Sequence, residues 1–188
     1  MKFKISQEEF SRLLGLANKS LQAKANLPIL ANILISASGK GIEFLSTDLE
    51  TATKVSVTCA VDVEGKTTVP GRFISEFISQ VPAGEIVFEK LGEEVKVSSK
   101  RYSARFATMP VEDFPAIPKI DRGKTLVFDG GDFLKAISRV AFSAAQDEGR
   151  PVLTGVLCEA AKKEFLMVAT DGYRLSYQQV LAEGDFGG

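Results

Sequence analysis

The chain has 188 residues, a near balance of 23 basic and 24 acidic side chains, and no histidine. This length allows one domain and part of another. The balanced charge does not signal a nucleic-acid partner, so a basic surface would have to be local. The missing histidine excludes Ser-His-Asp, Cys-His and histidine-based metal sites on this chain, and two cysteines are too few for a disulfide framework.

The N-terminus has no apolar segment of the kind found in secretory signals, and no apolar run approaches 18 residues. A membrane-spanning helix needs about that length. We therefore expect a soluble, cytoplasmic protein without a membrane partner.

A repeat of domain size organises the sequence. Thr47-Asp48 returns as Thr170-Asp171, and the same offset of 123 residues (171 − 48) relates Phe10 to Phe133. Residues 2–57 align with residues 125–180 on this offset without a gap, which is typical of a duplicated structural unit. Cys158 takes the place of Ile35 in the alignment, so we expect it to be a small buried hydrophobe.

The first part of the chain predicts one β-α-β-β-β unit. Residues 2–5 alternate like a strand, and residues 6–21 carry apolar side chains at helical spacing, with Ser6 as the N-cap and Glu9 three residues later. The three strands that follow are expected at residues 29–37, 42–46 and 52–61, with a turn at residues 39–41.

A second unit follows with the same order of elements. Residues 66–69 form its first strand, and Pro70 opens its helix at the first helical position. Pro82 and Gly84 end that helix. The remaining strands are expected at residues 85–90, 95–99 and 102–108.

Residues 110–123 contain three prolines and no periodicity, so we interpret them as an interdomain linker. The third unit has its strands at residues 124–128, 152–160, 165–170 and 173–180, and a helix that carries Phe133, Ile137 and Val140. The predicted fold class is α+β, built from repeated β-α-β-β-β units. The predicted domains are residues 1–118, with two units, and residues 119–188, with one.

The third unit has no second unit to cover it within the chain. Its helix would leave Phe133, Leu134 and Ile137 bare on one flank, and its outer strands would have unpaired backbone groups. This arrangement favours a homo-oligomer. Two alternatives stay open: a symmetric pairing of two copies through residues 124–180, or a partly disordered third unit.

Basic residues lie opposite the apolar stripes of the predicted helices. They are Arg12 and Lys19 in the first helix and Lys135 and Arg139 in the third, without acidic residues at the centre of that face, while the second helix offers Arg72 beside Glu76. For one helix this pattern describes an ordinary solvated face. Two equivalent helices with the same pattern favour sequence-independent binding of a phosphate backbone.

The two Thr-Asp pairs occupy the same place in both copies of the repeat. A feature that both copies retain is better explained by the fold, as a turn in which the aspartate caps backbone N–H groups, than by metal binding or acid–base catalysis. The residues that follow differ between the copies. Gly172, Tyr173, Arg174 and Leu175 are of the types that form an anchoring pocket for a peptide.

Several motifs together resemble one family, the bacterial sliding clamps that are the beta subunits of DNA polymerase III. They are the N-terminal Met-Lys-Phe, Leu27–Asn32, Thr47–Glu50, Thr68–Arg72, Phe114-Pro115 and Ala169–Leu175. The resemblance implies a DNA-clamp fold, in which helices line a channel around duplex DNA, and a ring of two chains with three similar domains each. It implies a processivity factor in DNA replication without catalysis or a cofactor.

The resemblance also implies partners and site residues. The expected partners are duplex DNA, DNA polymerase III subunits, the clamp loader and other proteins with clamp-binding peptides. Arg12, Lys19, Lys24, Arg72, Lys135 and Arg139 would contact DNA. The wall of the partner-peptide pocket would be formed by Arg150, Val152, Leu153, Thr170, Gly172, Tyr173, Arg174 and Leu175.

Two departures from the family stand out. Chains of the family are about twice as long, so this chain corresponds to a truncated clamp that cannot close the usual ring. Tyr173 stands where many relatives carry histidine, which keeps an aromatic plane but removes a group that titrates near neutral pH. The alternatives to a clamp are a protein-interaction module with this fold that does not encircle DNA, and an enzyme, for which no nucleophile–base constellation is present.

Overall fold

The computed structural model describes residues 1–21, 27–118, 126–147, 149–161, 164–181 and 183–184. It divides into two units, Met1–Pro118 (unit 1) and Lys119–Gly188 (unit 2). No helix in these described ranges is both long and apolar enough to cross a membrane.

Unit 1 contains two β-α-β-β-β halves. The first half consists of β1 (Lys2–Ser6), α1 (Gln7–Ala17), η1 (Asn18–Ser20), η2 (Pro28–Ala31), β2 (Asn32–Ser38), β3 (Gly41–Thr47) and β4 (Ala52–Val57). After the short strand β5 (Val61–Val63), the second half consists of β6 (Gly65–Pro70), α2 (Gly71–Gln80), β7 (Glu85–Leu91), β8 (Glu94–Ser99) and β9 (Tyr102–Ala107), followed by η3 (Val111–Asp113).

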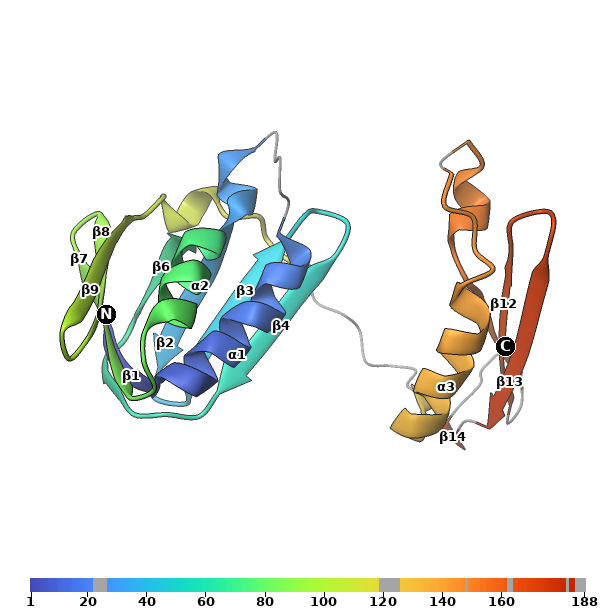
Figure 1. Cartoon of the computed structure of the whole chain (residues 1–188), viewed down its shortest axis with the longest axis horizontal. Coiled ribbons are helices and arrows are strands. Elements are labelled where there is room, and N and C mark those ends of the chain that lie inside the picture. Colours follow the sequence, from blue (N-terminus) through green and yellow to red (C-terminus); the bar gives the residue numbers. More distant parts are fainter. Residues whose placement is uncertain (22–26, 119–125, 148, 162–163, 182, 185–188) are drawn as a thin grey trace. The chain divides into compact units, whose positions relative to one another are not determined.

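The two halves exchange their first strands. β1 leaves its own half and lies between β5 and β7 in the five-stranded sheet β5-β1-β7-β8-β9, whereas β6 pairs with β2 in the four-stranded sheet β4-β3-β2-β6. The helices α1 and α2 contact each other and lie side by side over the sheets (Figure 1). The sequence predicted two paired halves but not the exchange of strands, because pairing between distant segments leaves no local signal.

One core joins the two halves of unit 1. The rings of Phe3 on β1 and Phe88 on β7 stack at 4.6 Å, and Phe10 on α1 meets both edge-on. All three side chains are fully buried. Because burial of apolar area is the main favourable term in folding, the two halves stabilise each other through the large core that they share.

Several predicted boundaries in unit 1 are wrong in detail. Residues 29–31 form the 3-10 turn η2 rather than the start of a strand, and the strand predicted at residues 52–61 is divided into β4 and β5, which join different sheets. Pro70 is the N-cap of α2 rather than its first helical residue. Phe114 lies in the predicted linker, although within the predicted first domain of residues 1–118, and it is buried together with Ile29 and Leu30 in unit 1.

Unit 2 consists of β10 (Leu126–Val127), α3 (Gly130–Ala141), η4 (Pro151–Thr154), β11 (Leu157–Ala161), β12 (Glu164–Thr170), β13 (Leu175–Leu181) and β14 (Glu183–Gly184). α3 packs on β12 and β13 of the three-stranded sheet β11-β12-β13 (Figure 1). The expectation for Cys158 is wrong, since Cys158 is exposed whereas its equivalent Ile35 is fully buried. In unit 1 the strand β6 lies beside Ile35, and the described part of unit 2 has no counterpart of β6.

Candidate nucleic-acid interface and peptide cleft

The predicted basic position on α1 carries an ion pair. Ser6 caps the helix by accepting a hydrogen bond from the backbone N–H of Glu9, as predicted. The Glu9 carboxylate then accepts two hydrogen bonds from the guanidinium of Arg12, at 2.7 and 3.2 Å. These bonds from Arg12 lower the pKa of Glu9 below its ordinary value. Arg12 is exposed, and its charge is already matched by a neighbour.

The same arrangement recurs on α3. Asp129 caps this helix by accepting from the backbone N–H of Asp132, and Asp132 in turn lies 3.5 Å from the Lys135 ammonium. Asp132 and Lys135 are the repeat equivalents of Glu9 and Arg12. The expectation that these faces lack acidic residues is therefore wrong for Arg12 and Lys135, because each of these two has an acidic partner three residues earlier on the helix surface.

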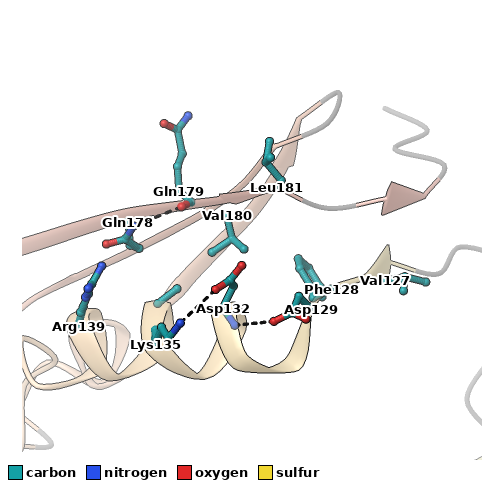
Figure 2. Close-up of a pocket in the computed structure, with 11 residues that line it drawn as sticks. Val127, Phe128, Asp129, Asp132, Lys135, Arg139, Gln178, Gln179, Val180 and Leu181 are labelled. Carbon is teal, nitrogen blue, oxygen red and sulfur yellow. Dashed lines mark hydrogen bonds and ion pairs between the residues drawn. The ribbon is translucent and has the colours of Figure 1, made fainter.

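Arg139 lies one turn after Lys135, beside β13. The two side chains line a cavity of about 540 Å³ that also includes Asp129, Asp132 and the residues Gln178–Leu181 of β13. Figure 2 shows Arg139 directed toward Gln178, while Lys135 is paired with Asp132. Two cations and two carboxylates leave the charges around this cavity close to balanced.

The remaining predicted DNA contacts lie on separate elements. Arg72 is exposed in the first turn of α2, where Pro70 provides no side-chain cap for the N–H groups of the helix. Uncapped N–H groups and an arginine at a helix N-terminus both favour a phosphate. Lys19 is exposed in η1 rather than in α1. Lys24 lies outside the described residues.

The two Thr-Asp turns have the same hydrogen bonds, which confirms the predicted capping role. Asp48 Oδ1 accepts from the backbone N–H of Glu50 and Thr51, and Asp171 Oδ1 accepts from the backbone N–H of Tyr173 and Arg174. The hydroxyl groups of the two threonines make matching contacts across their turns. For Asp171, the N–H groups of Arg174 and Tyr173 lower the carboxyl pKa below its ordinary value.

A cleft of about 460 Å³ lies beside the second of these turns. Its lining consists of Ala144, Ala145, Gln146, Asp147, Arg150, Leu153, Asp171, Tyr173 and Arg174. Of the predicted pocket residues, the structure brings Arg150, Leu153, Tyr173 and Arg174 together here. The other predicted pocket residues do not line the cleft. They are Thr170 and Gly172 in the turn, Leu175 at the start of β13, and Val152, which is 87% exposed to solvent.

Arg174 is held in position within the cleft wall. Its Nε donates to Asp171 Oδ2 at 2.9 Å, and its guanidinium lies over the ring of Phe142 at 5.5 Å from the centroid. Tyr173, in contrast, is fully exposed. The cleft thus offers one preorganised cation, one free aromatic ring and the partly buried Leu153 to a ligand.

The sequence did not indicate residues 144–147 as part of this cleft. They follow α3, and the backbone N–H of Ala145 donates to the carbonyl of Leu153 at 2.9 Å, which holds the loop against η4. Such a backbone contact depends on the tertiary structure and carries no residue pattern. The described part of the chain also has no cluster of three or more histidine, cysteine, aspartate or glutamate side chains that could hold a metal ion.

Sequence models of two domains match the chain. The DNA polymerase III beta subunit N-terminal domain matches residues 1–118, and the central domain of the same subunit matches residues 128–185. The chain belongs to the DNA polymerase III beta subunit family. In family terms, unit 1 is the N-terminal domain, and unit 2 contains the part of the central domain that was matched.

Individual members of the beta subunit family are similar along nearly the whole chain. The beta sliding clamp of Micrococcus luteus is 29% identical over 180 residues, covering 96% of this chain and 58% of the relative. The beta sliding clamp of Streptomyces coelicolor is 30% identical over 183 residues, covering 96% of this chain and 48% of the relative. The chain therefore spans about half the length of the curated relatives it matches.

Solved structures of beta subunits have the same fold. The subunit from Thermotoga maritima is 30% identical with a TM-score of 0.86, and one from Pseudomonas aeruginosa bound to griselimycin is 26% identical with a TM-score of 0.92. Each comparison covers 98% of this chain and 50% of the solved chain. The DNA-clamp fold expected from the sequence is confirmed.

Proposed function

We propose that this chain acts as a sliding clamp: a non-catalytic protein of DNA replication that holds duplex DNA without reading its sequence and docks peptides of partner proteins. The observation that carries the proposal is family membership over both units. The cytoplasmic location and the polymerase and clamp-loader partners expected from the sequence belong to the same proposal.

The charges favour weak, electrostatic binding of DNA. The basic side chains proposed for contact are exposed where the structure describes them, which leaves out Lys24, but Arg12 and Lys135 are each matched by a carboxylate. A phosphate must therefore compete with Glu9 and Asp132 for these cations. We expect a dissociation constant on the order of 10⁻⁴ to 10⁻⁶ M at physiological salt, as for non-specific binding.

A salt titration with fluorescent duplexes tests this part of the proposal. Changing Arg12→Ala together with Lys135→Ala should weaken binding equally for unrelated sequences and reduce the slope of log K against log salt by up to roughly 0.9 per lost contact. Lys54→Ala on β4 is the matched control, because it removes a cation that is also paired with a carboxylate, Glu43. Strong dependence on base sequence would sink the proposal.

The alternative function, a protein-interaction module that does not encircle DNA, is separated by DNA topology. Protein bound to closed circular DNA and to linear DNA of equal length is washed with high salt. Retention on circles but not on linear DNA supports topological encircling by an assembly that includes this chain. Release from both, together with intact peptide binding, favours the interaction module.

The cleft is the proposed site for peptides of partner proteins. Leu153 and the ring of Tyr173 supply apolar surface, and Arg150 and the fixed Arg174 supply positive charge. This combination suits a segment with an apolar anchor and a nearby carboxylate. Since a Pseudomonas aeruginosa relative was solved bound to griselimycin, labelled griselimycin is a practical probe for the cleft of this chain.

Fluorescence polarisation with this probe tests the cleft. Leu153→Ala should weaken binding by about 2 kcal/mol, or roughly thirtyfold, because it removes buried apolar contact. Val152→Ala is the matched control, because Val152 lies on the same turn and points away from the cleft. Equal effects of the two changes, or none from Leu153→Ala, would show that the cleft is not the binding site.

A further inference from the structure

The two Thr-Asp turns differ at the residue with positive φ. Leu49 occupies this position in unit 1 and Gly172 in unit 2, and both turns keep the threonine and aspartate hydrogen bonds described above. The turn therefore forms with a leucine as well as with a glycine, although a side chain is strained in this conformation. The backbone conformation alone does not explain the glycine of unit 2.

The missing side chain of Gly172 leaves room for the guanidinium of Arg150. A Cβ on Gly172 would lie 3.4 Å from Arg150 Nη1, which is ordinary van der Waals contact. A branched side chain built on that Cβ would compete with the guanidinium for space. The repeat equivalents of Arg150 and Gly172 are Leu27 and Leu49, both exposed. Unit 2 thus has an arginine beside a bare turn where unit 1 has two leucines.

Arg174 takes a role in its turn that belongs to Thr51 in unit 1. Thr51 Oγ1 donates to Asp48 Oδ2 at 3.1 Å, and Arg174 Nε donates to Asp171 Oδ2 at 2.9 Å. The two donors are repeat equivalents, 123 residues apart. Because the same bond occurs in both turns, the fold explains the position of Arg174. Its charge is also matched by the carboxylate to which it donates.

Arg150 differs from Arg174 in both respects. It precedes η4, outside the turn, and is exposed. In the described part of the chain, which leaves out Glu148, no carboxylate oxygen lies within 4 Å of the Arg150 guanidinium. Asp147, the other carboxylate of the cleft, accepts a hydrogen bond from the backbone N–H of Gly149 in its own loop. Arg150 can therefore direct its charge at a ligand.

The apolar anchor of the cleft lies next to Arg150. The backbone N–H of Leu153 donates to the carbonyl of Arg150 at 2.9 Å, and side chains three residues apart in a 3-10 turn lie on the same side. Both residues line the cleft. A ligand whose carboxylate is a few bonds from an apolar group can contact both at once, and an arginine can hold a carboxylate through two parallel hydrogen bonds.

We propose that Arg150 selects ligands in which a carboxylate adjoins the apolar anchor, and that Gly172 is a positioning residue that keeps the space of the Arg150 guanidinium open. Arg174 shapes the turn and does not discriminate between charged and neutral ligands. This inference rests on the proposed role of the cleft as a peptide site. The carboxylate is that of an acidic side chain or of a free C-terminus, since both present the same group.

Small ligands test the selection without an assumed peptide sequence. The full chain is titrated, by nuclear magnetic resonance, with two matched pairs: N-acetyl-leucine against N-acetyl-leucinamide, and acetyl-leucyl-aspartyl amide against acetyl-leucyl-asparaginyl amide. Ligands of this size should bind with roughly millimolar dissociation constants. At least one charged ligand should bind about three- to fivefold more tightly than its neutral counterpart, as for an exposed ion pair. The pair that shows this preference identifies the source of the carboxylate. Equal affinities within both pairs overturn the proposal.

Substitutions of the two arginines assign the preference. Arg150→Gln should abolish it, and Arg150→Lys should retain part of it because the charge remains. Arg174→Thr introduces the residue that makes the same bond in unit 1, and it should leave the preference unchanged. The ratio of affinities within a pair is the readout, because a damaged fold or anchor weakens both ligands alike. A preference that survives Arg150→Gln, or that disappears in Arg174→Thr, overturns the proposal.

Two substitutions of Gly172 test its positioning role. Gly172→Leu introduces the residue of unit 1 and should reduce the preference for the carboxylate to near one, while the neutral ligand binds as before. Gly172→Ala is the matched control, because it brings the same backbone strain but its Cβ leaves the guanidinium its place. It should keep the preference. Circular dichroism checks that both variants fold. Equal losses in the two variants, or no loss in Gly172→Leu, overturn the positioning role.

Competition with griselimycin separates this inference from the proposed function. If griselimycin displaces the small ligands and its binding depends on Leu153, the cleft stands as a binding site. Equal affinities for charged and neutral ligands would then overturn the selection by Arg150 alone. If the carboxylate preference follows Arg150 while griselimycin does not bind, the selection stands and the proposed peptide site fails. If no ligand binds, both are overturned.

Discussion

Leu49 holds a backbone conformation that ordinarily belongs to glycine. Its φ is 78°, and the equivalent residue in the second Thr-Asp turn is Gly172, with a φ of 91°. A side chain in this region costs roughly 1–2 kcal/mol. Hydrogen bonds across the Asp48 turn keep Leu49 in place, while its side chain is mostly exposed and contributes little packing.

Leu49→Gly should leave unit 1 unchanged in stability or stabilise it by up to about 1 kcal/mol. The substitution relieves the strain at positive φ, and the greater backbone freedom of glycine in the unfolded chain offsets part of the gain. Gly172→Ala should destabilise unit 2 by about 1 kcal/mol, because alanine is strained at this positive φ. The added Cβ itself causes no clash, since its one close neighbour is Arg150 Nη1 at 3.4 Å. Urea unfolding measures both changes, and a clear loss of stability in Leu49→Gly would contradict this account.

The Asp48 turn should also make stability depend on acid pH. The backbone N–H of Thr51 is the main cause that lowers the pKa of Asp48 in the folded chain. A carboxyl group whose folded pKa lies below its unfolded value of about 3.9 stabilises the fold above that value, and the stabilisation is lost as pH falls through the folded pKa. The unchanged chain should therefore be more stable to unfolding than Asp48→Asn at pH 5, and this difference in unfolding free energy should shrink as the pH falls to roughly 3, through the two pKa values. Glu112→Gln, an exposed carboxyl group elsewhere in unit 1, controls for the change in charge.

At the level of elements, local patterns predicted the helices well and the strand partners poorly. The apolar spacing of α1 and α3 and the cap at Ser6 were correct because they depend on residues within one or two turns. The apolar run of residues 29–31 suits a strand as well as a 3-10 turn, and its true partner, Phe114, is distant in sequence. The exchange of β1 and β6 likewise depends on pairing between distant segments.

The site was predicted to a similar extent. Family motifs identified four of the residues that line the cleft. The loop after α3 was not predicted, because a backbone hydrogen bond holds it beside the cleft and such a bond leaves no residue pattern. The ion pairs on α1 and α3 were readable from the spacing of Glu9 to Arg12 and of Asp132 to Lys135. The helical projection considered acidic residues only at the centre of each face, whereas Glu9 and Asp132 lie three residues before the cations with which they pair.

These ion pairs lead to a prediction about DNA affinity. Glu9→Gln removes a negative charge from the face of α1 and releases Arg12, so duplex binding at low salt should strengthen about three- to tenfold. The slope of log K against log salt should become steeper by up to roughly one unit. Asp132→Asn should act in the same direction on α3. The measurement is the same salt titration used above. Glu43→Gln on β3 is the matched control, since Glu43 pairs with Lys54 on the sheet. Equal gains in duplex affinity from Glu9→Gln and Glu43→Gln would show that the change in net charge, and not the release of Arg12, strengthens binding.

At the level of the whole molecule, unit 1 should fold without unit 2. Its two halves share one core, and Phe114 closes a smaller cluster at its end. A chain of residues 1–118 should melt in one cooperative transition with a van't Hoff enthalpy on the order of 70 kcal/mol. Residues 1–99 serve as the control, because they lack β9 and Phe114, and they should melt broadly or not at all. A broad transition for residues 1–118 would show that unit 1 depends on unit 2.

The exchanged strands of unit 1 have a consequence for synthesis on the ribosome. β1 is made before β2, β3, β4 and α2, yet β7, with which it pairs along its full length, is made only after them. Until then, the native pairing open to β1 is the one with the short strand β5, at Lys2 and Phe3, and β2 waits in the same way for β6. Contacts between such distant segments slow folding and leave strand edges exposed to aggregation. Most of unit 1 is therefore translated before the first strand can pair along its full length with β7, and a chaperone has the most to protect in this period.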